Sequence, residues 1–220
     1  VLSGTGVLSA DVTISSPATL STTGATTIAG SLTVGSSAVV VVTNSLAIEG
    51  NLDVSGTLSG AGTATLSGNA SATIDVSGST TISCVILIQK NSTAETVTLV
   101  DAGTTTLAGR LEVGGGTLRI DAGKTLVVNG ANPSVAASRG LIELVGGTAA
   151  LTATNGLTLS GSGALVGDGT VNGAVTVTGA SASFDAGTAT FTGAVVVQTG
   201  AIFTVGGTGT LTLNVSVALS

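Results

Sequence analysis

The chain has 220 residues, of which 7% are charged, 1% are aromatic and 34 are glycine, and its formal net charge is −6. Ordinary domains carry about 25% charged residues, yet a hydrophobic content of 43% is too high for a disordered chain. With no histidine, one cysteine and five basic residues, the sequence offers no histidine catalysis, no zinc site and no basic surface for nucleic acid. It contains no run of about 20 apolar residues that could form a transmembrane segment, and no cofactor is expected.

A short motif of alternating apolar and polar residues first appears in the N-terminal quarter of the chain. It reads "IAGSLTV" at 28–34 and "IEGNLDV" at 48–54, twenty residues further on. Alternate residues of a strand point to opposite faces, so we expect Leu52 and Val54 in a core and Asp53 in water. The glycine inside the motif marks a corner that needs a positive φ or a close approach of two backbones. We assign this turn role to Gly30, Gly50, Gly109, Gly173 and Gly193.

The motif is less regular in the middle of the chain, between 57 and 100 and between 127 and 156. The apolar runs "AVVVV" (38–42) and "CVILI" (84–88) have the length of buried strands. The lone Cys84 is therefore expected to be a small buried side chain. Two segments, 89–96 and 129–140, are predicted to leave the regular structure as loops. The second contains Pro133, which cannot donate to a strand ladder.

The tripeptide Asp-Ala-Gly recurs in the second half of the chain. It opens "DAGTTTLAGRLEV" at Asp101 and "DAGTATFTGAVVV" at Asp185, and a third copy begins at Asp121. An aspartate at a corner can accept a hydrogen bond from the backbone two residues on, so these residues are predicted to form turns. Calcium binding is the alternative, but Ca²⁺ takes six to eight oxygen ligands. Isolated carboxylates favour the turn, and we predict no metal site.

Charged side chains outside these corners offer little for catalysis. Arg110 with Glu112, and Arg119 with Asp121, alternate outward on neighbouring strands and are predicted to form solvated cross-strand charge pairs. The sequence has no tyrosine or tryptophan to stack on a sugar. Its three phenylalanines occupy apolar positions of the motif and are expected in the core: Phe184, Phe191 and Phe203. We predict no catalytic residues and no enzymatic activity, which leaves a glycan-active β-helical enzyme as the third of three functional hypotheses.

Repeats of 20 to 50 residues indicate a solenoid, a propeller or an array. Twenty residues are too few for a propeller blade but enough for one turn of a β-helix. The sequence therefore predicts an all-β protein, a single-stranded β-helix (β-solenoid) with about 20 residues per turn and roughly eleven turns, stacked at about 4.8 Å. No linker divides the chain, so residues 1–220 are predicted to form a single elongated domain.

From Leu157 the chain reads "LTLSGSGALVGDGTVNGAVTVTGASASFDAGTATFTGAVVVQTGAIFTV". This text resembles the passenger regions of autotransporters and related filamentous β-solenoid adhesins of bacteria, most clearly over 99–128 and 157–217. The resemblance implies a secreted or surface-displayed scaffold without an active site. It also implies an extracellular location, with a signal sequence already removed.

The two ends of the predicted rod show no helical or charged cap in the sequence. The segment 210–220 alternates without a glycine and is predicted to form one long terminal strand. It could be the last turn of a longer passenger, could cap its own rod, or could pair with another subunit. The third possibility gives our first hypothesis, a structural subunit of an extracellular filament that assembles head to tail with copies of itself. The candidate interface residues are Leu211, Leu213, Val215, Val217, Leu219, Val1 and Leu2.

The second hypothesis is the passenger or stalk of a surface adhesin. In that case the side loops would contact a receptor or glycan on a host or neighbouring cell. The same repeated scaffold would then serve to hold the loops away from the cell that displays them.

Overall fold

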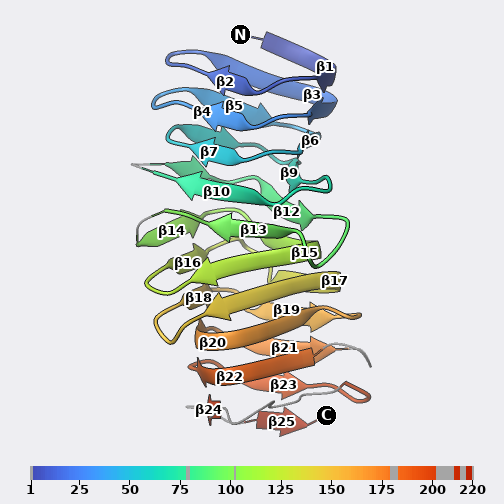
Figure 1. Cartoon of the computed structure of the whole chain (residues 1–220), viewed down its shortest axis with the longest axis vertical. Coiled ribbons are helices and arrows are strands. Elements are labelled where there is room, and N and C mark those ends of the chain that lie inside the picture. The colour runs from blue at the N-terminus through green and yellow to red at the C-terminus, as the bar shows by residue number, and fades with distance from the viewer. Residues whose placement is uncertain are drawn as a thin grey trace.

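The computed structural model describes residues 2–77, 80–101, 103–178, 183–201, 211–213 and 217–219. Within these ranges every regular element is a β-strand, and every strand pairing is parallel. The chain winds into a rod with its termini at opposite ends (Figure 1). The prediction of an all-β solenoid is confirmed.

The turns of the solenoid, called rungs below, number about nine with roughly 21 residues each. They are fewer and slightly longer than predicted from the sequence, because the rung length changes along the rod. Leu46 pairs with Ala64 near the N-terminal end, whereas Ile86 pairs with Leu111 further along. The longer middle rungs have room for loops between their strands.

Each rung has three faces, named here after their first dedicated strands. The β2 face contains β2 (Val12–Ile14), β4 (Leu32–Val34), β7 (Leu52–Val54), β10 (Ala72–Val76) and β13 (Thr96–Leu99). The β5 face contains β5 (Val39–Val42), β8 (Thr57–Ser59), β11 (Thr81–Ile82), β14 (Thr104–Leu107), β16 (Thr125–Val128), β18 (Ala150–Ala153) and β24 (Leu211–Leu213). The β6 face contains β6 (Ser45–Ile48), β9 (Thr63–Leu66), β12 (Val85–Gln89), β19 (Leu157–Ser160), β21 (Val175–Thr178), β23 (Val195–Val197) and β25 (Val217–Leu219).

Six longer strands bend around a corner and belong to two faces. β1 (Leu2–Leu8) and β3 (Thr19–Ile28) run from the β5 face to the β6 face. β15 (Leu111–Asp121) and β17 (Ser134–Val145) run from the β6 face to the β2 face. β20 (Ala164–Asn172) and β22 (Ser183–Phe191) run from the β2 face to the β5 face.

The interior is filled by the inward residue of each alternating pair. Strands on all three faces show the burial pattern of alternating buried and half-buried residues, as in β5 and β9. Residues of the same type stack in columns: Leu32 pairs with Leu52, and Val34 pairs with Val54. Their complete burial removes branched aliphatic surface from water in every rung, at about 1.5–3 kcal/mol for each such side chain.

Side chains continue the hydrogen-bond ladder at the corner before the β2 face. The backbone N–H of Ser31 donates to Asp11 Oδ1 at 2.7 Å, that of Asn51 donates to Ser31 Oγ at 3.1 Å, and that of Thr73 donates to Asn51 Oδ1 at 2.9 Å. Each short polar side chain thus accepts a bond from the next rung where the strand ladder is interrupted. This explains why Asp, Ser and Asn occupy equivalent places in successive copies of the motif.

The glycines assigned to corners are required mainly by close packing of rungs. A Cβ at Gly50 would lie 2.8 Å from the carbonyl carbon of Gly30, and a Cβ at Gly30 would lie 2.6 Å from the backbone nitrogen of Asp11. The same crowding exists at Gly109 and Gly193. Gly173 adds a positive φ of 115°. Two reasons were predicted for a corner glycine. Close approach of two backbones applies at all five assigned positions, and a positive φ applies at one of them, Gly173.

The predicted loops differ in extent from those in the structure. Residues 90–95 lie between β12 and β13, and Ser92 N donates to Glu95 Oε2 at 2.5 Å within this loop. The predicted excursion at 129–140 is too long, because β17 begins at Ser134. Ala136 of this segment is buried and pairs with Val113, so only the residues up to Pro133 leave the ladder.

Candidate functional surfaces

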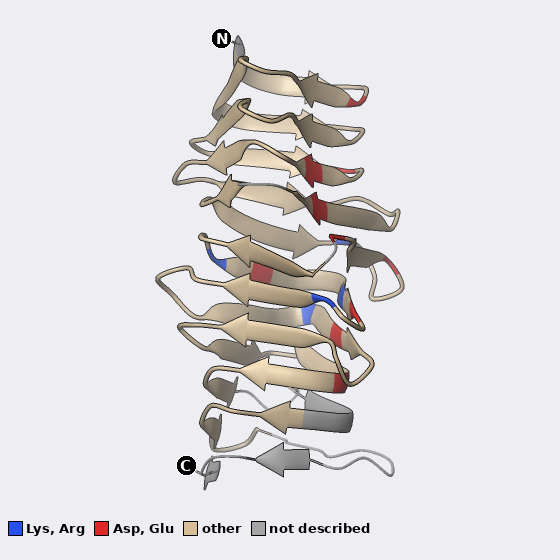
Figure 2. Cartoon of the chain, turned by 90° about the vertical axis from the view of Figure 1, so that its left-hand side faces the viewer, with Lys and Arg blue, Asp and Glu red and all other residues tan. Residues whose placement is uncertain are grey.

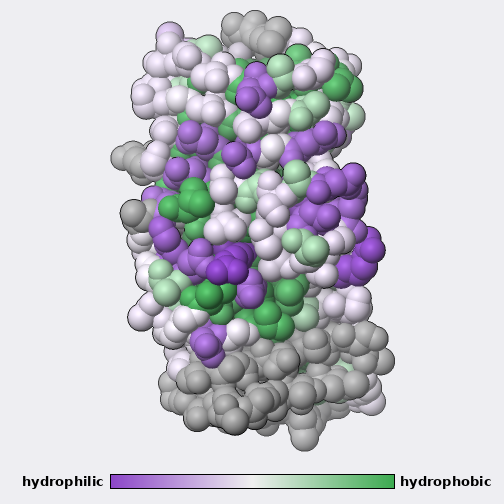
Figure 3. Space-filling view, in the orientation of Figure 1, coloured by the Kyte–Doolittle hydropathy of each residue, from purple (hydrophilic) through white to green (hydrophobic). Residues whose placement is uncertain are grey.

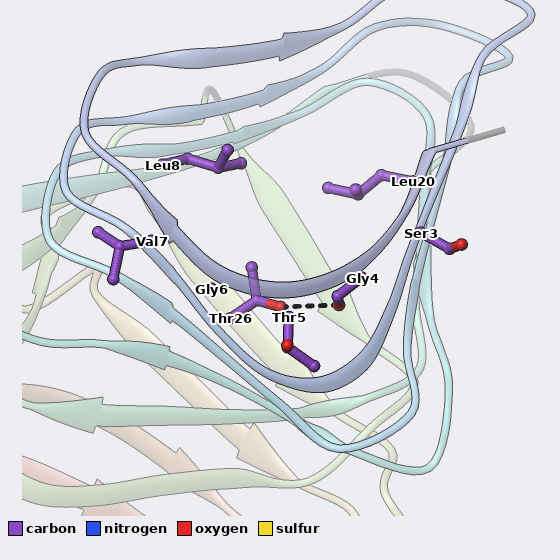
Figure 4. A pocket seen from close by; sticks show the side chains of 8 residues that line it. All are labelled: Ser3, Gly4, Thr5, Gly6, Val7, Leu8, Leu20 and Thr26. Atoms are coloured by element: carbon purple, nitrogen blue, oxygen red, sulfur yellow. Dashed lines mark hydrogen bonds between the residues drawn. The ribbon is translucent and has the colours of Figure 1, made fainter.

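β1 is the first described strand, and an apolar hollow lies beneath it. Among the described residues, β1 pairs with β3 and with no second strand. Residues 3–8 curve over a cavity of about 150 Å³ that Leu20 and Thr26 close from below (Figure 4). Val7 is 70% exposed, while Leu20, on the opposite side of the hollow, is 4% exposed. The only polar contact drawn there is from Thr26 Oγ1 to the carbonyl of Gly4, at 3.3 Å. Of the candidate interface residues at this end, Leu2 opens β1 and Val1 lies outside the described residues.

The C-terminal candidates belong to two strands on two different faces. Leu211 and Leu213 lie in β24, which pairs with β22 on the β5 face. Val217 and Leu219 lie in β25, which pairs with β23 on the β6 face. Val215 lies outside the described residues. The described part of 210–220 therefore forms two strands on two faces, rather than the one long strand predicted.

The acidic side chains gather on one side of the rod, at the right in Figure 2. Asp53 and Asp75 pair directly on the β2 face. Burial, and secondly the charge of Asp75, raises the pKa of Asp53. Like charges directly opposite each other destabilise a sheet, so this pair opposes the stacking of its own rungs.

The predicted charge pairs form, but each joins two residues two positions apart along the chain at β15 rather than residues of two strands. Arg110 lies 2.7 Å from Glu112, and Arg119 Nε donates to Asp121 Oδ1 at 2.8 Å. Arg119 also reaches Glu143 on the next strand at 3.6 Å, a contact that the sequence did not reveal. The hydrogen bond to Asp121 raises the pKa of the Arg119 guanidinium. About a third of each of these side chains is exposed, which fits solvated structural pairs.

Of the predicted Asp-Ala-Gly turns, the one at Asp121 forms, because Lys124 N donates to the backbone carbonyl of Asp121 at 3.0 Å. The carboxylates of Asp101 and Asp121 bond side chains instead of the backbone. Asp101 Oδ2 accepts from Thr105 Oγ1 at 3.3 Å, and the Asp121 carboxylate accepts from Arg119. Asp185 lies inside β22 rather than at a corner. Within the part of the chain that the structure describes, no group of three or more Cys, Asp or Glu side chains could hold a metal ion.

Lys90 is a buried basic residue to which the sequence assigned no role. Its side chain is 0% exposed. Its Nζ donates to the carbonyl oxygens of Ser67 and, at 3.3 Å, of Glu49, in the two preceding rungs. Burial lowers the pKa of Lys90, while Glu49 and Glu95 act in the opposite direction. The signal in the sequence was the motif itself, because Ile88-Gln-Lys90 stands where other copies have Ile-x-Gly.

The other predicted core positions are partly tested. Cys84 is 1% exposed, and burial raises the pKa of its thiol to about 11, so it is an inert core residue. Phe191 is fully buried as predicted. The side chain of Phe184 and all of Phe203 lie outside what the structure describes.

The face drawn in Figure 3 mixes polar and apolar side chains. Hydrophilic residues cross the middle of the rod beside apolar patches. Away from the rod end, Val100 is an exposed hydrophobic side chain, at 40%. In the described part of the chain, no helix is long and apolar enough to cross a membrane.

Comparison with models of protein families, with curated proteins and with solved structures found no significant match. The identification therefore ends at the class of fold, a parallel β-solenoid. The resemblance to autotransporter passengers gains no support from these comparisons.

Proposed function

We propose that this chain is a structural subunit of an extracellular fibre, joined end to end with copies of itself through the edges of its terminal rungs. The observation that carries the proposal is the edge of β1. Among the described residues, this edge offers a row of backbone groups without a strand partner, next to the apolar hollow lined by Val7 and Leu20. Unpaired strand edges are templates for another strand.

The chemistry of the two ends supports parallel stacking. Every pairing within the rod is parallel, and Leu2–Gly4 stands on the β5 face where β24 stands at the other end. A rung bearing β24 and β25 from a second copy would continue the β5 and β6 faces over β1. Such head-to-tail contacts do not close on themselves, so they give filaments. An extracellular location fits the resemblance in the second half of the sequence.

A matched pair of substitutions tests the proposal. Val7→Asp places a charge on the hollow at the rod end, and Val100→Asp places the same charge on another exposed valine at the side of the rod. Sedimentation should show large assemblies for the wild type and for Val100→Asp, and single chains for Val7→Asp. If residues of a longer chain cover this edge instead, Val7→Asp lowers stability and leaves particle mass unchanged. That result would contradict the proposal.

The adhesin hypothesis has one structural observation in its favour. The loop at 90–95 projects between β12 and β13 and is held by bonds of its own, from Ser92 N to Glu95 and from Ala94 N to Ser92 Oγ. A preformed loop on a stiff rod is a typical binding element. Replacing residues 91–94 of the loop by Gly and Ser, which keeps the buried Lys90, should leave assembly intact and abolish attachment to cells if this second function holds.

A further inference from the structure

The β5 face carries a regular grid of outward threonine side chains. The strand register aligns one column of outward residues in successive rungs, and the bond from Ala108 N to Ile82 O aligns β14 with β11. The column consists of Thr19, Val39, Thr57, Thr81, Thr106, Val127, Thr152 and Asn172. A second column stands two residues earlier along the strands in the C-terminal half: Thr104, Thr125, Ala150, Thr170, Thr190. These two columns are called the threonine grid.

The spacing of the threonine grid is fixed by the fold. Neighbours within a column are one strand apart, about 4.8 Å, and neighbours across the columns are two residues apart, about 6.7 Å. Threonine is branched at Cβ, so few χ1 rotamers are available to it in a strand. Two of the four exceptions in the columns, Val39 and Val127, are valine, which has the same branched shape; the others are Ala150 and Asn172. The grid therefore presents methyl groups and hydroxyls at nearly fixed, repeating positions.

The threonine grid carries no charge. The described acidic and basic side chains lie at corners or on the other two faces, as Asp53, Arg119 and Glu143 do on the β2 face. In Figure 2 the strands that cross the front, on the side where β14, β16 and β18 lie, are tan over most of their length. A surface without charge complements a neutral partner.

The hydroxyl groups of the grid are largely unused by the protein. Within the described part of the chain, those of Thr57, Thr81 and Thr106 form no hydrogen bond to another residue. Only the C-terminal end of the first column bonds internally, from Asn172 Nδ2 to Thr152 Oγ1 at 3.1 Å and from Thr192 Oγ1 to Asn172 Oδ1 at 2.9 Å. Each free hydroxyl can donate one hydrogen bond and accept two, so it can bond to water in both directions.

We propose that the threonine grid binds the surface of ice. The partner must repeat along the rod, be neutral, and both donate and accept hydrogen bonds, and the lattice of frozen water has all three properties. Its oxygen repeat is close to the strand spacing, so hydroxyls in one column can take successive lattice positions. The intervening methyl groups order the water around them. A crystalline polysaccharide fits less well, because no tyrosine or tryptophan is present to stack on sugar rings.

The test is the partition of the protein between slowly growing ice and the liquid. The wild type should be concentrated in the ice and should slow the coarsening of fine ice crystals. Thr106→Lys adds a long cation at the centre of the grid and should abolish both effects. Thr158→Lys places the same cation at an outward, half-buried threonine of the β6 face, between Val135 and Thr176, and should leave both unchanged.

A second substitution separates loss of ice binding from misfolding of the Thr106→Lys variant. Thr106→Val keeps the branched shape and removes one hydroxyl, so it should fold normally and weaken uptake only partly. Exclusion of the wild type from ice overturns the proposal. Equal behaviour of Thr106→Lys and Thr158→Lys overturns it too. A third result would also overturn it: a wild type that is a dimer in liquid water and that Thr106→Lys converts to a monomer. In that case a second copy of the chain would cover the grid.

Discussion

Lys90 Nζ donates to the carbonyl oxygen of Glu49 across 3.3 Å, although the two residues are separated by 41 positions in the sequence. The same amine bonds Ser67 in the rung between them. One side chain thus ties three consecutive rungs together inside a corner that other copies of the motif leave to glycine.

Replacing Lys90 by methionine should lower the free energy of unfolding by about 1–3 kcal/mol at neutral pH, because buried carbonyls lose their donor. Burial lowers the pKa of Lys90 below 10.5, so the unfolded chain binds the proton more tightly than the folded one. The stability of the wild type relative to Lys90→Met should therefore rise as the pH rises toward 10.5. Denaturant unfolding of both proteins at several pH values measures this difference.

Lys124 provides the control for that experiment. Its Nζ also donates to two backbone carbonyls, of Val100 and Asp101, but its side chain is only half-buried. Lys124→Met should cost less, since water can reach the freed carbonyls. An equal loss in both variants, independent of pH, would show that burial of Lys90 is not the cause.

Gly50→Ala should destabilise the rod by about 1–3 kcal/mol, the usual cost of overpacking a tight site. The new methyl group would lie 2.8 Å from the backbone of Gly30 and 2.7 Å from Ser31 Oγ. Gly147→Ala is the matched control, because nothing lies within 4 Å of its Cβ position. That variant should be neutral or slightly stabilising. Thermal unfolding separates the two, and equal midpoints would refute the close approach of rungs at this corner.

Asp53→Asn should stabilise the protein at neutral pH by about 0.2–1 kcal/mol, the range for a cross-strand pair. The folded state raises the pKa of Asp53 above 3.8, so the wild type loses stability as the pH rises from 3.8 through the folded pKa. The advantage of the asparagine should vanish below pH 3.8, where Asp53 is protonated in both states, and should shrink in high salt. Unfolding midpoints at low and neutral pH test this, and an advantage that persists in acid would contradict it.

Cys84 should react with a thiol reagent only when the rod opens. The thiol is buried and its pKa is raised to about 11, so little thiolate exists near neutral pH. Labelling should be slow in buffer and immediate in denaturant. Fast labelling of the folded protein would place Cys84 outside the core.

The solenoid could be predicted because its cause is local. Alternation of apolar residues fixes which side chains face inward, and glycine at a crowded corner fixes where each face ends, as at Gly50. The rung length was less accurate, since insertions such as the loop at 90–95 change it without changing the motif. The segment 210–220 was predicted as one strand because its apolar residues alternate throughout. Alternation alone does not show that Leu211 and Leu219 belong to strands on different faces.

The candidate surfaces depended on contacts that a linear repeat does not display. Arg119 meets Glu143 only after the strands are aligned. The carboxylate of Asp121 pairs with Arg119, while the backbone carbonyl of Asp121 accepts from Lys124 N in the turn. The threonines of the grid are scattered along the sequence, and only the strand register places Thr81 beside Thr106. The buried amine of Lys90 replaced a glycine, a change that composition could not reveal.

Electron microscopy of the purified protein at increasing concentration tests the structural role most directly. The account predicts filaments that lengthen with concentration and whose rung repeat of about 4.8 Å continues through every junction between subunits. Single short rods at all concentrations, with the edge of β1 left free, would contradict end-to-end assembly.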